Sequence, residues 1–279
     1  MSHKEIGHQF LARLGKKRLR PGGVQATNWL IKKGHFSADS RVLEVACNQC
    51  TSSIDIAKAF SCHITALDLD SKVIEKAKEN VKKAQLEEFI EVIQGNALKL
   101  PFPDNSFDIV INEAMLTMLS NSAKEKAIKE YLRVLKPGGC LLTHDVSYQD
   151  EDTAKLIDQL RHTINVNVAP LKIDDWQNLF LQNGFSSSEY QFGKMSLMSP
   201  LGMIKDEGLF NTIKIISRGL KNERCPHPKL INVLEGKLEI ILGDQKHILE
   251  KDSLISLSPQ EIHHLRAIEN SKFLQIELD

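Results

Sequence analysis

Acidic and amide side chains occur at the carboxyl ends of several short apolar runs. Glu44 lies near the end of RVLEVA (41–46), Asp68 ends HITALD (63–68), and Asn112 ends FDIVIN (107–112), with Glu113 directly after it. Asp68 follows the first run by about 20 residues, a spacing that suits a carboxylate accepting both ribose hydroxyls of a nucleoside. His144 ends a later run, and histidine is the best general base at neutral pH. These residues predict a nucleoside site, with His144 and Glu113 as candidate catalytic residues.

The loop after the first run provides a second part of this site. Ala46, Asn48 and their neighbours lead directly into the helix predicted for TSSIDIAKAF (51–60). A strand, a tight loop and a helix N-terminus together form a cradle for a polar ligand. Asn96 follows another apolar run and offers an amide to an adenine edge. The loop and Asn96 are therefore candidate cofactor contacts.

The spacing of the apolar runs predicts how these residues are positioned. Strands are expected at 41–46, 63–68, 89–94, 107–112 and 140–146, and helices at 51–60, 71–84 and 123–135, with Ser71 as an N-cap. Strands that alternate with helices form a parallel sheet with right-handed crossovers, so the predicted fold class is α/β, doubly wound and Rossmann-like. Ligands bind such sheets beyond the carboxyl ends of their strands.

Changes of pattern along the chain predict three regions. Residues 1–36 form a helical cap interrupted by Pro21-Gly22-Gly23, and residues 37–224 form the α/β domain with a helical substrate lid at 151–224. Residues 225–279 carry short β-rich runs separated by turn residues and form a small all-β domain.

The composition narrows the classes of partner. The 36 basic residues balance 36 acidic ones, and the missing basic excess argues against nucleic acid. The sequence has no membrane-spanning run and no secretory signal. Its five cysteines have no disulfide-framework spacing, so we expect a cytoplasmic protein without a membrane partner. Cys47 and Cys50 form a C-x-x-C without the second pair that zinc needs, which favours loop packing over metal or redox chemistry.

A basic cluster near the N-terminus has two interpretations. It comprises Lys16, Lys17, Arg18 and Arg20. The favoured interpretation is a solvated helix face, and the alternative is attraction of an anionic acceptor.

Four segments resemble the class I S-adenosylmethionine-dependent methyltransferases, in particular the quinone- and phosphobase-methylating type. They are VLEVACNQCT (42–51), ITALDLD (64–70), GNALKLPFPDNSFDIVI (95–111) and YLRVLKPGG (131–139). The resemblance implies methyl transfer from S-adenosylmethionine to a small-molecule acceptor. It implies that Asp68 binds the ribose, that Leu69 flanks the adenine, and that Asn96 and Ala97 lie at the adenine. It also implies that the turn with Gly23 closes over the methionine end. The full candidate cofactor set is Gly23, Glu44, Ala46, Asn48, Asp68, Leu69, Asn96, Ala97 and Asn112.

The cofactor loop departs from this family. Three positions that usually hold glycine carry Ala46, Asn48 and Cys50. Glycine is favoured there because it adopts positive φ freely. Alanine costs little where φ is negative, and asparagine tolerates the left-handed region better than most residues. Two alternatives to the small-molecule enzyme stay open: a non-catalytic cofactor-binding or regulatory protein, and a nucleic-acid methyltransferase. The second lacks its usual Asn/Asp-Pro-Pro-aromatic motif after the fourth strand.

The C-terminal region resembles part of a cupin, over VLEGKLEIILG (233–243) and LEKDSLISLSPQEIHHL (249–265). Lys229 stands where a metal-binding cupin has a glutamate, and only His227 with His263 or His264 is available. Since catalytic metal sites typically use three protein ligands, we expect no metal. A few short strands cannot cover their own faces and edges. The tail is therefore expected to pack on residues 185–222 or to pair with a second copy in a homodimer.

Overall fold

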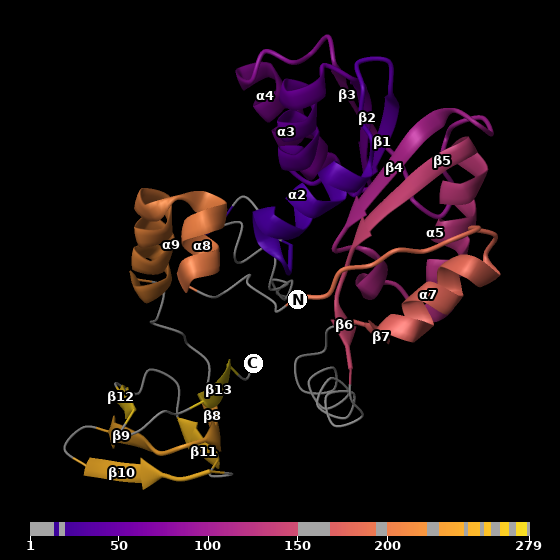
Figure 1. Ribbon diagram of the computed structural model, residues 1–279. Coiled ribbons are helices and arrows are strands. Elements are labelled where there is room, and N and C mark those ends of the chain that lie inside the picture. The colour runs from indigo at the N-terminus through magenta and orange to yellow at the C-terminus, as the bar shows by residue number, and fades with distance from the viewer. Residues whose placement is uncertain are drawn as a thin grey trace. The chain divides into compact units, whose positions relative to one another are not determined.

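The computed structural model describes residues 14–16, 20–149, 168–193, 200–221, 229–242, 245–251, 254–257, 263–267 and 272–277 of the chain. It divides into two units, Met1–Ile215 and Ile216–Asp279 (Figure 1). The division falls inside a helix, whereas the change of pattern in the sequence predicts a domain boundary at 224/225.

A parallel sheet forms the centre of the first unit. Its strands are β1 (Arg41–Val45), β2 (His63–Asp68), β3 (Ile90–Gln94), β4 (Phe107–Glu113) and β5 (Leu135–His144). Their order in the sheet is β3-β2-β1-β4-β5, and each neighbouring pair runs parallel. The order reverses beside β1, which creates the switch point where such sheets bind ligands. The predicted doubly wound α/β fold is confirmed.

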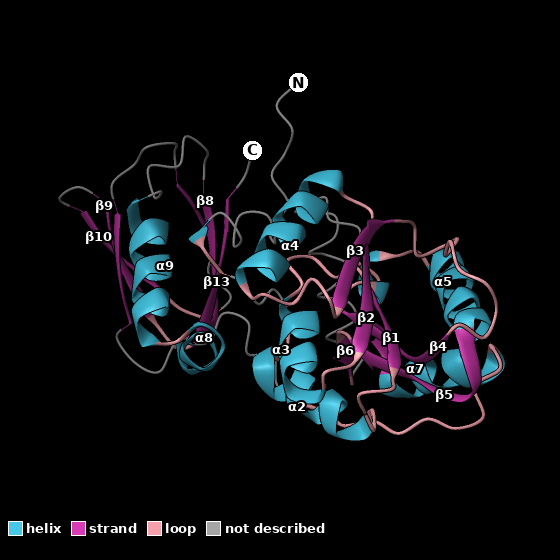
Figure 2. Cartoon of the chain, turned by 90° about the horizontal axis from the view of Figure 1, so that it is seen from above, coloured by secondary structure: helices cyan, strands magenta, loops and turns pink. Residues whose placement is uncertain are grey.

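Helices cover both faces of this sheet (Figure 2). On one face lie α2 (Gly23–Lys33), α3 (Thr51–Phe60) and α4 (Ser71–Lys83), and on the other α5 (Asn121–Val134) and α7 (Ile173–Gln182). Alternate residues of β1 serve the two sides: Val42 belongs to the apolar cluster with α3 and α4, and Leu43 to the cluster with α5 and Trp176 of α7. Burial on both faces fixes the register of the central strands, because a one-residue slip would exchange the two sets of side chains.

The boundaries of two helices differ from the sequence prediction. The N-cap of α4 is Asp70, whose carboxylate accepts the Lys72 N–H at 2.9 Å. Ser71 is instead the first helical residue, because the extended backbone that an N-cap requires falls one position earlier. Helix α5 ends at Val134, and the segment 135–139 already belongs to β5, with Gly138 at φ +79°.

The remaining described elements of the first unit are short. The 3₁₀ turn η1 (Leu116–Met118) follows β4, and β6 (Ser147–Tyr148) pairs with β7 (Leu171–Lys172). Helices α8 (Pro200–Glu207) and α9 (Leu209–Lys221) lie in the predicted lid region.

The N-terminal basic residues are held inside the first unit. Lys16 is fully buried and its Nζ lies 3.2 Å from Oδ2 of Asp206 in α8. The other carboxylate oxygen of Asp206 accepts the Val24 N–H at 2.8 Å. Arg20 is only 5% exposed. The interpretation as a solvated face is therefore wrong for Lys16 and Arg20, because buried carboxylates far along the chain pair with them. Lys17 and Arg18 lie outside the described residues.

The second unit consists of antiparallel strands. They are β8 (Lys229–Glu235), β9 (Leu238–Leu242), β10 (Gln245–Leu249), β11 (Leu254–Leu257), β12 (His263–Ala267) and β13 (Lys272–Glu277). They form two three-stranded sheets, β10-β9-β12 and β11-β8-β13. Lys229 begins β8, while His263 and His264 begin β12; His227 lies outside the described residues. The cupin likeness, the packing of the tail and the absence of a metal stay predictions.

Gly23 is required where the N-terminal segment enters α2, and this gives a stability prediction. It has φ +58°, and a Cβ there would lie 2.2 Å from Oδ1 of Asp206. Gly138 shares the positive φ, but no atom of the described residues lies within 4 Å of its Cβ position. Gly138→Ala should therefore lower the free energy of unfolding by only the left-handed strain, about 1–2 kcal/mol. Gly23→Ala also displaces a buried carboxylate from Lys16 and should cost about 3 kcal/mol or more.

Urea unfolding of the two variants and the parent chain measures this difference. Equal losses of stability in both variants would contradict the close approach of Asp206 to Gly23.

Candidate active site

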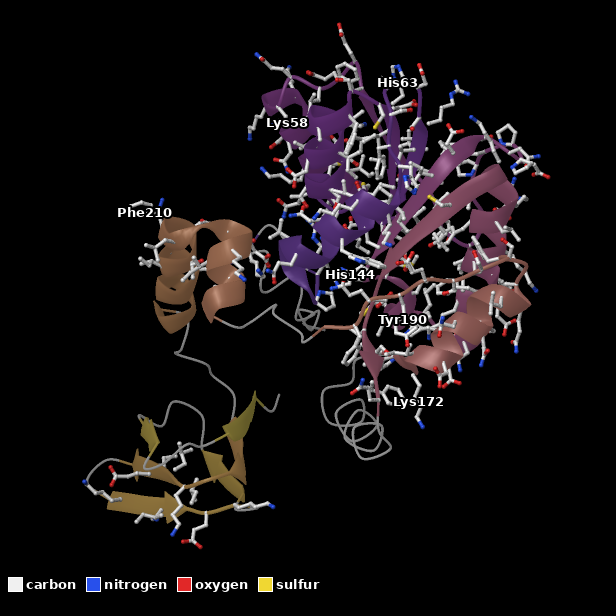
Figure 3. The ribbon with its side chains drawn as sticks, viewed as in Figure 1. Lys58, His63, His144, Lys172, Tyr190 and Phe210 are labelled. Carbon is white, nitrogen blue, oxygen red and sulfur yellow. The ribbon has the colours of Figure 1, made fainter. Side chains whose placement is uncertain are left out.

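The sheet register brings the predicted polar residues to one edge. Val45 pairs with Asn112, and Glu113 pairs with His144. Asp68 ends β2 opposite Gln94 at the end of β3. Because all five strands are parallel, their carboxyl ends share this edge. Figure 3 shows His144 near α2, at the end of β5.

Glu113 is the centre of a buried polar network. Its Oε1 accepts hydrogen bonds from Arg20 Nη1 at 2.5 Å and from Ser52 Oγ at 2.7 Å. Its Oε2 accepts the Thr27 hydroxyl at 2.7 Å and lies 3.3 Å from His144 Nδ1. Only 6% of the Glu113 side chain is exposed. The network thus joins the N-terminal segment, α2, α3 and β5 to the end of β4.

The charged partners decide the ionisation of Glu113. Burial alone would raise the pKa of this carboxyl, but the His144 hydrogen bond and the Arg20 charge, with Ser52, lower the pKa to about 2. Glu113 is therefore a carboxylate at neutral pH and a weak base. In this arrangement its main effect is to hold Arg20 and His144 in place.

Both ring nitrogens of His144 have partners. Nε2 accepts the Gly22 N–H at 3.1 Å, so Nδ1 carries the proton that faces Glu113. A Cβ at Gly22 would lie 3.0 Å from that Nε2, so glycine permits the contact. For Nε2 to accept a proton from a substrate, the bond to Gly22 must first break.

Arg20 has donors without partners. Its Nη1 bonds to Glu113 and Ser52, whereas Nε and Nη2 are buried and find no acceptor among the described residues. A buried donor without an acceptor is costly, and guanidinium groups bind carboxylates with two parallel bonds. The sequence pattern shows Arg20 only as part of the basic cluster and does not predict it as a residue of the site. Its position next to the Pro21-Gly22-Gly23 turn was the available signal.

The cofactor loop keeps a glycine-like backbone without glycine. Ala46, Asn48 and Cys50 have φ of 58°, 47° and 58°, which is the left-handed region. The expectation that alanine costs little at negative φ does not apply at Ala46, since its φ is positive. Left-handed backbone costs a non-glycine residue about 1–2 kcal/mol, so this loop is locally strained.

Asp68 fastens the loop to β2. Its Oδ2 accepts the Asn48 N–H at 3.0 Å, and its Oδ1 accepts the Asp70 N–H at 3.1 Å. Each carboxylate oxygen retains a further lone pair for a hydroxyl donor. The next residue, Leu69, is 66% exposed and offers an apolar surface beside that carboxylate.

Glu44 is a second buried carboxyl below the loop. It accepts the Ser53 N–H at 3.0 Å and also the Ser53 hydroxyl. Burial raises its pKa to about 7, although the Ser53 hydrogen bonds oppose the change. Glu44 therefore caps α3 and titrates near neutral pH.

The other candidate residues have varied environments. Asn112 is fully buried; its amide donates to Val45 O at 3.3 Å, and its Oδ1 finds no donor among the described residues. Asn96 is exposed, and its Oδ1 accepts the Leu98 N–H at 2.9 Å. Ala97 packs against the cluster on the α5 face.

Cys47 and Cys50 are both buried thiols. The hydrogen bond with Cys50 and burial both raise the pKa of Cys47. The environment of Cys47 therefore disfavours a reactive thiolate. Among the described residues no group of three His, Cys, Asp or Glu side chains could hold a metal ion.

Comparison with known proteins places this geometry in a family. A model described as a methyltransferase domain matches residues 42–139. A demethylmenaquinone methyltransferase of Staphylococcus haemolyticus is 30% identical over 195 residues, covering 67% of this chain and 75% of that protein. The chain belongs to the S-adenosylmethionine-dependent methyltransferases.

Other relatives of this methyltransferase match to different extents. An uncharacterized protein of Haemophilus influenzae is 55% identical over 80% of this chain and 89% of its own length. A demethylmenaquinone methyltransferase of Listeria welshimeri is 39% identical, but the match spans 39% of this chain and 45% of that protein. The crystal structure of the MccD protein shares 25% identity and a TM-score of 0.54, covering 58% of this chain and 72% of that one.

The family assignment favours an enzyme over the non-catalytic alternative raised by the lost glycines. No described helix of this methyltransferase is both long and apolar enough to cross a membrane.

The strain in the cofactor loop predicts a stabilising substitution. Ala46→Gly should raise the free energy of unfolding by about 1 kcal/mol, because glycine adopts φ 58° without a Cβ clash. Ala84→Gly is the matched control, since Ala84 has φ −83°. There glycine should lower stability by about 0.5–1 kcal/mol through backbone entropy. Thermal unfolding of both variants gives the signs, and a loss of stability in Ala46→Gly would contradict a strained loop.

Proposed function

We propose that this methyltransferase transfers the methyl group of S-adenosylmethionine to a small-molecule acceptor at the carboxyl edge of the sheet. The observation that carries the proposal is the left-handed loop at 46–50, bonded through Asn48 to the Asp68 carboxylate. The small-molecule class of the acceptor is supported by the relatives named demethylmenaquinone methyltransferase. The zero net charge argues against a nucleic-acid acceptor.

The residues at this edge fit the nucleoside part of the cofactor. Asp68 would accept the ribose hydroxyls with the lone pairs that Asn48 and Asp70 leave unused. Leu69, exposed beside it, would cover one side of the adenine. Asn96 and Ala97, after β3, would contact the same base.

The methionine part of the cofactor finds complementary groups on the other side of the loop. Its carboxylate would accept hydrogen bonds from Nε and Nη2 of Arg20, which are buried and have no acceptor in the described part of the chain. Oδ1 of Asn112, which has no donor among the residues that the structure describes, and the titrating Glu44 would face its ammonium group. Gly22 and Gly23 bring the N-terminal segment close to this end through their contacts with His144 and Asp206.

When bound, the cofactor supplies an electrophilic methyl group on a sulfonium sulfur. The chain's own task is then alignment and exclusion of water, because displacement at the methyl requires an in-line approach at close range. The network around Glu113 fixes Arg20 and His144 for this purpose.

We propose His144 as the acid–base candidate and Glu113 as a positioning residue. Nε2 of His144 is the ring nitrogen that would accept a proton, but the Gly22 N–H already donates to it. Proton transfer at Nε2 therefore requires a displacement of the turn at Gly22. The cytoplasmic location and the homodimer stay predictions.

Asp68→Ala tests the ribose contact. Loss of a hydrogen bond to a charged group costs about 1.5–3 kcal/mol, so affinity for S-adenosylhomocysteine should fall at least tenfold in isothermal titration. Asp39→Ala removes an exposed aspartate and should leave the affinity unchanged. If the Asp68 variant and the parent bind S-adenosylhomocysteine with equal affinity, the assignment of Asp68 to the ribose is wrong.

Arg20→Lys tests the methionine carboxylate contact. Lysine keeps the charge beside Glu113 but not the two free donors of the guanidinium fork. Affinity for S-adenosylhomocysteine should fall by about tenfold, the value of one hydrogen bond to a charged group. Methylthioadenosine has the nucleoside but no carboxylate, so it should bind both proteins equally. A parallel loss for both ligands would show that Arg20 acts only on the fold.

A further inference from the structure

Within the first unit, α8 and the start of α9 have an inner face that packs on residues 14–16. Met203 and Ile215 form a buried cluster with Leu14. Asn211 donates to Gly15 O at 3.3 Å, and Thr212 is 2% exposed. The acidic side chains of α8 also lie on the inner face, since Lys16 Nζ is 3.2 Å from Asp206 and 3.8 Å from Glu207.

The opposite side is apolar and basic, and we call it the outer face. Phe210 is 82% exposed, Leu209 55% and Ile213 54%. Figure 3 shows Phe210 at the start of α9, projecting away from α8. The outer face comprises Ile204, Lys205, Leu209, Phe210, Ile213 and Lys214, all of them exposed.

The distribution of charge selects the kind of partner. Asp206 and Glu207 are buried against Lys16, so they do not offset Lys205 and Lys214. The sequence of α9 contains Lys214, Arg218 and Lys221 and no acidic residue. Large apolar side chains surrounded by lysine are typical of helices that lie on anionic membranes.

We propose that the outer face binds the surface of an anionic lipid bilayer, with Leu209, Phe210 and Ile213 entering the boundary between headgroups and acyl chains. This goes beyond the proposed function and does not depend on it. In a symmetric dimer through this face, the same patch of both copies would meet. The lysines of one copy would then lie near the lysines of the other. The sequence-based expectation of no membrane partner rested on the missing spanning run, which excludes insertion across a bilayer but not binding at its surface.

Vesicle cosedimentation of the full chain tests the proposal. The parent chain should bind vesicles made of equal parts phosphatidylcholine and phosphatidylglycerol, and added salt should weaken this binding. Phe210→Ser combined with Ile213→Ser should lower the partition coefficient at least about tenfold, because two exposed apolar side chains no longer insert. Lys214→Gln should lower it by about fivefold on these vesicles and leave weak binding to pure phosphatidylcholine unchanged.

Matched controls come from other helices of the same unit. Leu181→Ser on α7 removes a side chain that is 43% exposed, and Lys126→Gln on α5 removes an exposed charge. Both should bind vesicles like the parent chain. Circular dichroism should show that every variant is folded. The salt dependence of vesicle binding is measured on the parent chain, so this test does not depend on the folding of any variant.

Three results would overturn the proposal. One is no binding of the folded parent chain to the anionic vesicles. A second is binding that the Phe210/Ile213 variant retains in full. Sedimentation equilibrium adds a third arm: a dimer that dissociates in the Phe210/Ile213 variant would assign the face to a second copy of the chain instead. Cofactor titration of the same variants should be unchanged, which separates this proposal from the assignment of the active site.

Discussion

The buried carboxylate of Glu113 is the interaction on which the candidate site depends. Arg20, Thr27, Ser52 and His144 approach it from four different segments. A buried carboxylate is stable only when charged and hydrogen-bonding partners compensate for its lost hydration. The same requirement that keeps Glu113 ionised therefore fixes the N-terminal segment against the carboxyl edge of the sheet. The entrance to α2 follows from it, because Gly22 reaches His144, which Glu113 orients.

The predictable part of this structure is the part encoded by local pattern. The apolar runs ending at Asp68 and Glu113 alternate with amphipathic helices, and periodicity with turn residues was enough to place them and infer a parallel sheet. The sequence pattern predicts a solvated face for Lys16 and Arg20, because a basic helical stretch is normally exposed to solvent. Their partners, Asp206 and Glu113, are distant in sequence and emerge only from the tertiary fold. Local pattern carries no signal for such pairs.

The loop at 46–50 keeps the left-handed backbone of the family although it lacks the glycines that usually adopt it. Ala46 and Cys50 both occupy the left-handed region, which glycine would adopt without strain. The fixed ends of the loop explain how this backbone persists. Cys50 N–H bonds to Cys47 O at 2.8 Å, and Asn48 N–H is held by Asp68. Without glycine, tertiary hydrogen bonds maintain this conformation at a local energetic cost.

Glu44 and Glu113 show how one edge of a sheet can hold two carboxyls with different protonation. Both are buried, yet the pKa is about 7 for Glu44 and about 2 for Glu113. Ser53 gives Glu44 neutral donors, whereas Arg20 and His144 give Glu113 a charge and a charge-stabilising hydrogen bond. The ionised Glu113 in turn raises the pKa of Glu44. Of these two carboxyls, Glu113 keeps a permanent negative charge that Arg20 already matches, and Glu44 ionises when a cation approaches. A cofactor with an ammonium group and a sulfonium would favour that ionisation, and the proton released from Glu44 would couple cofactor binding to pH near neutrality.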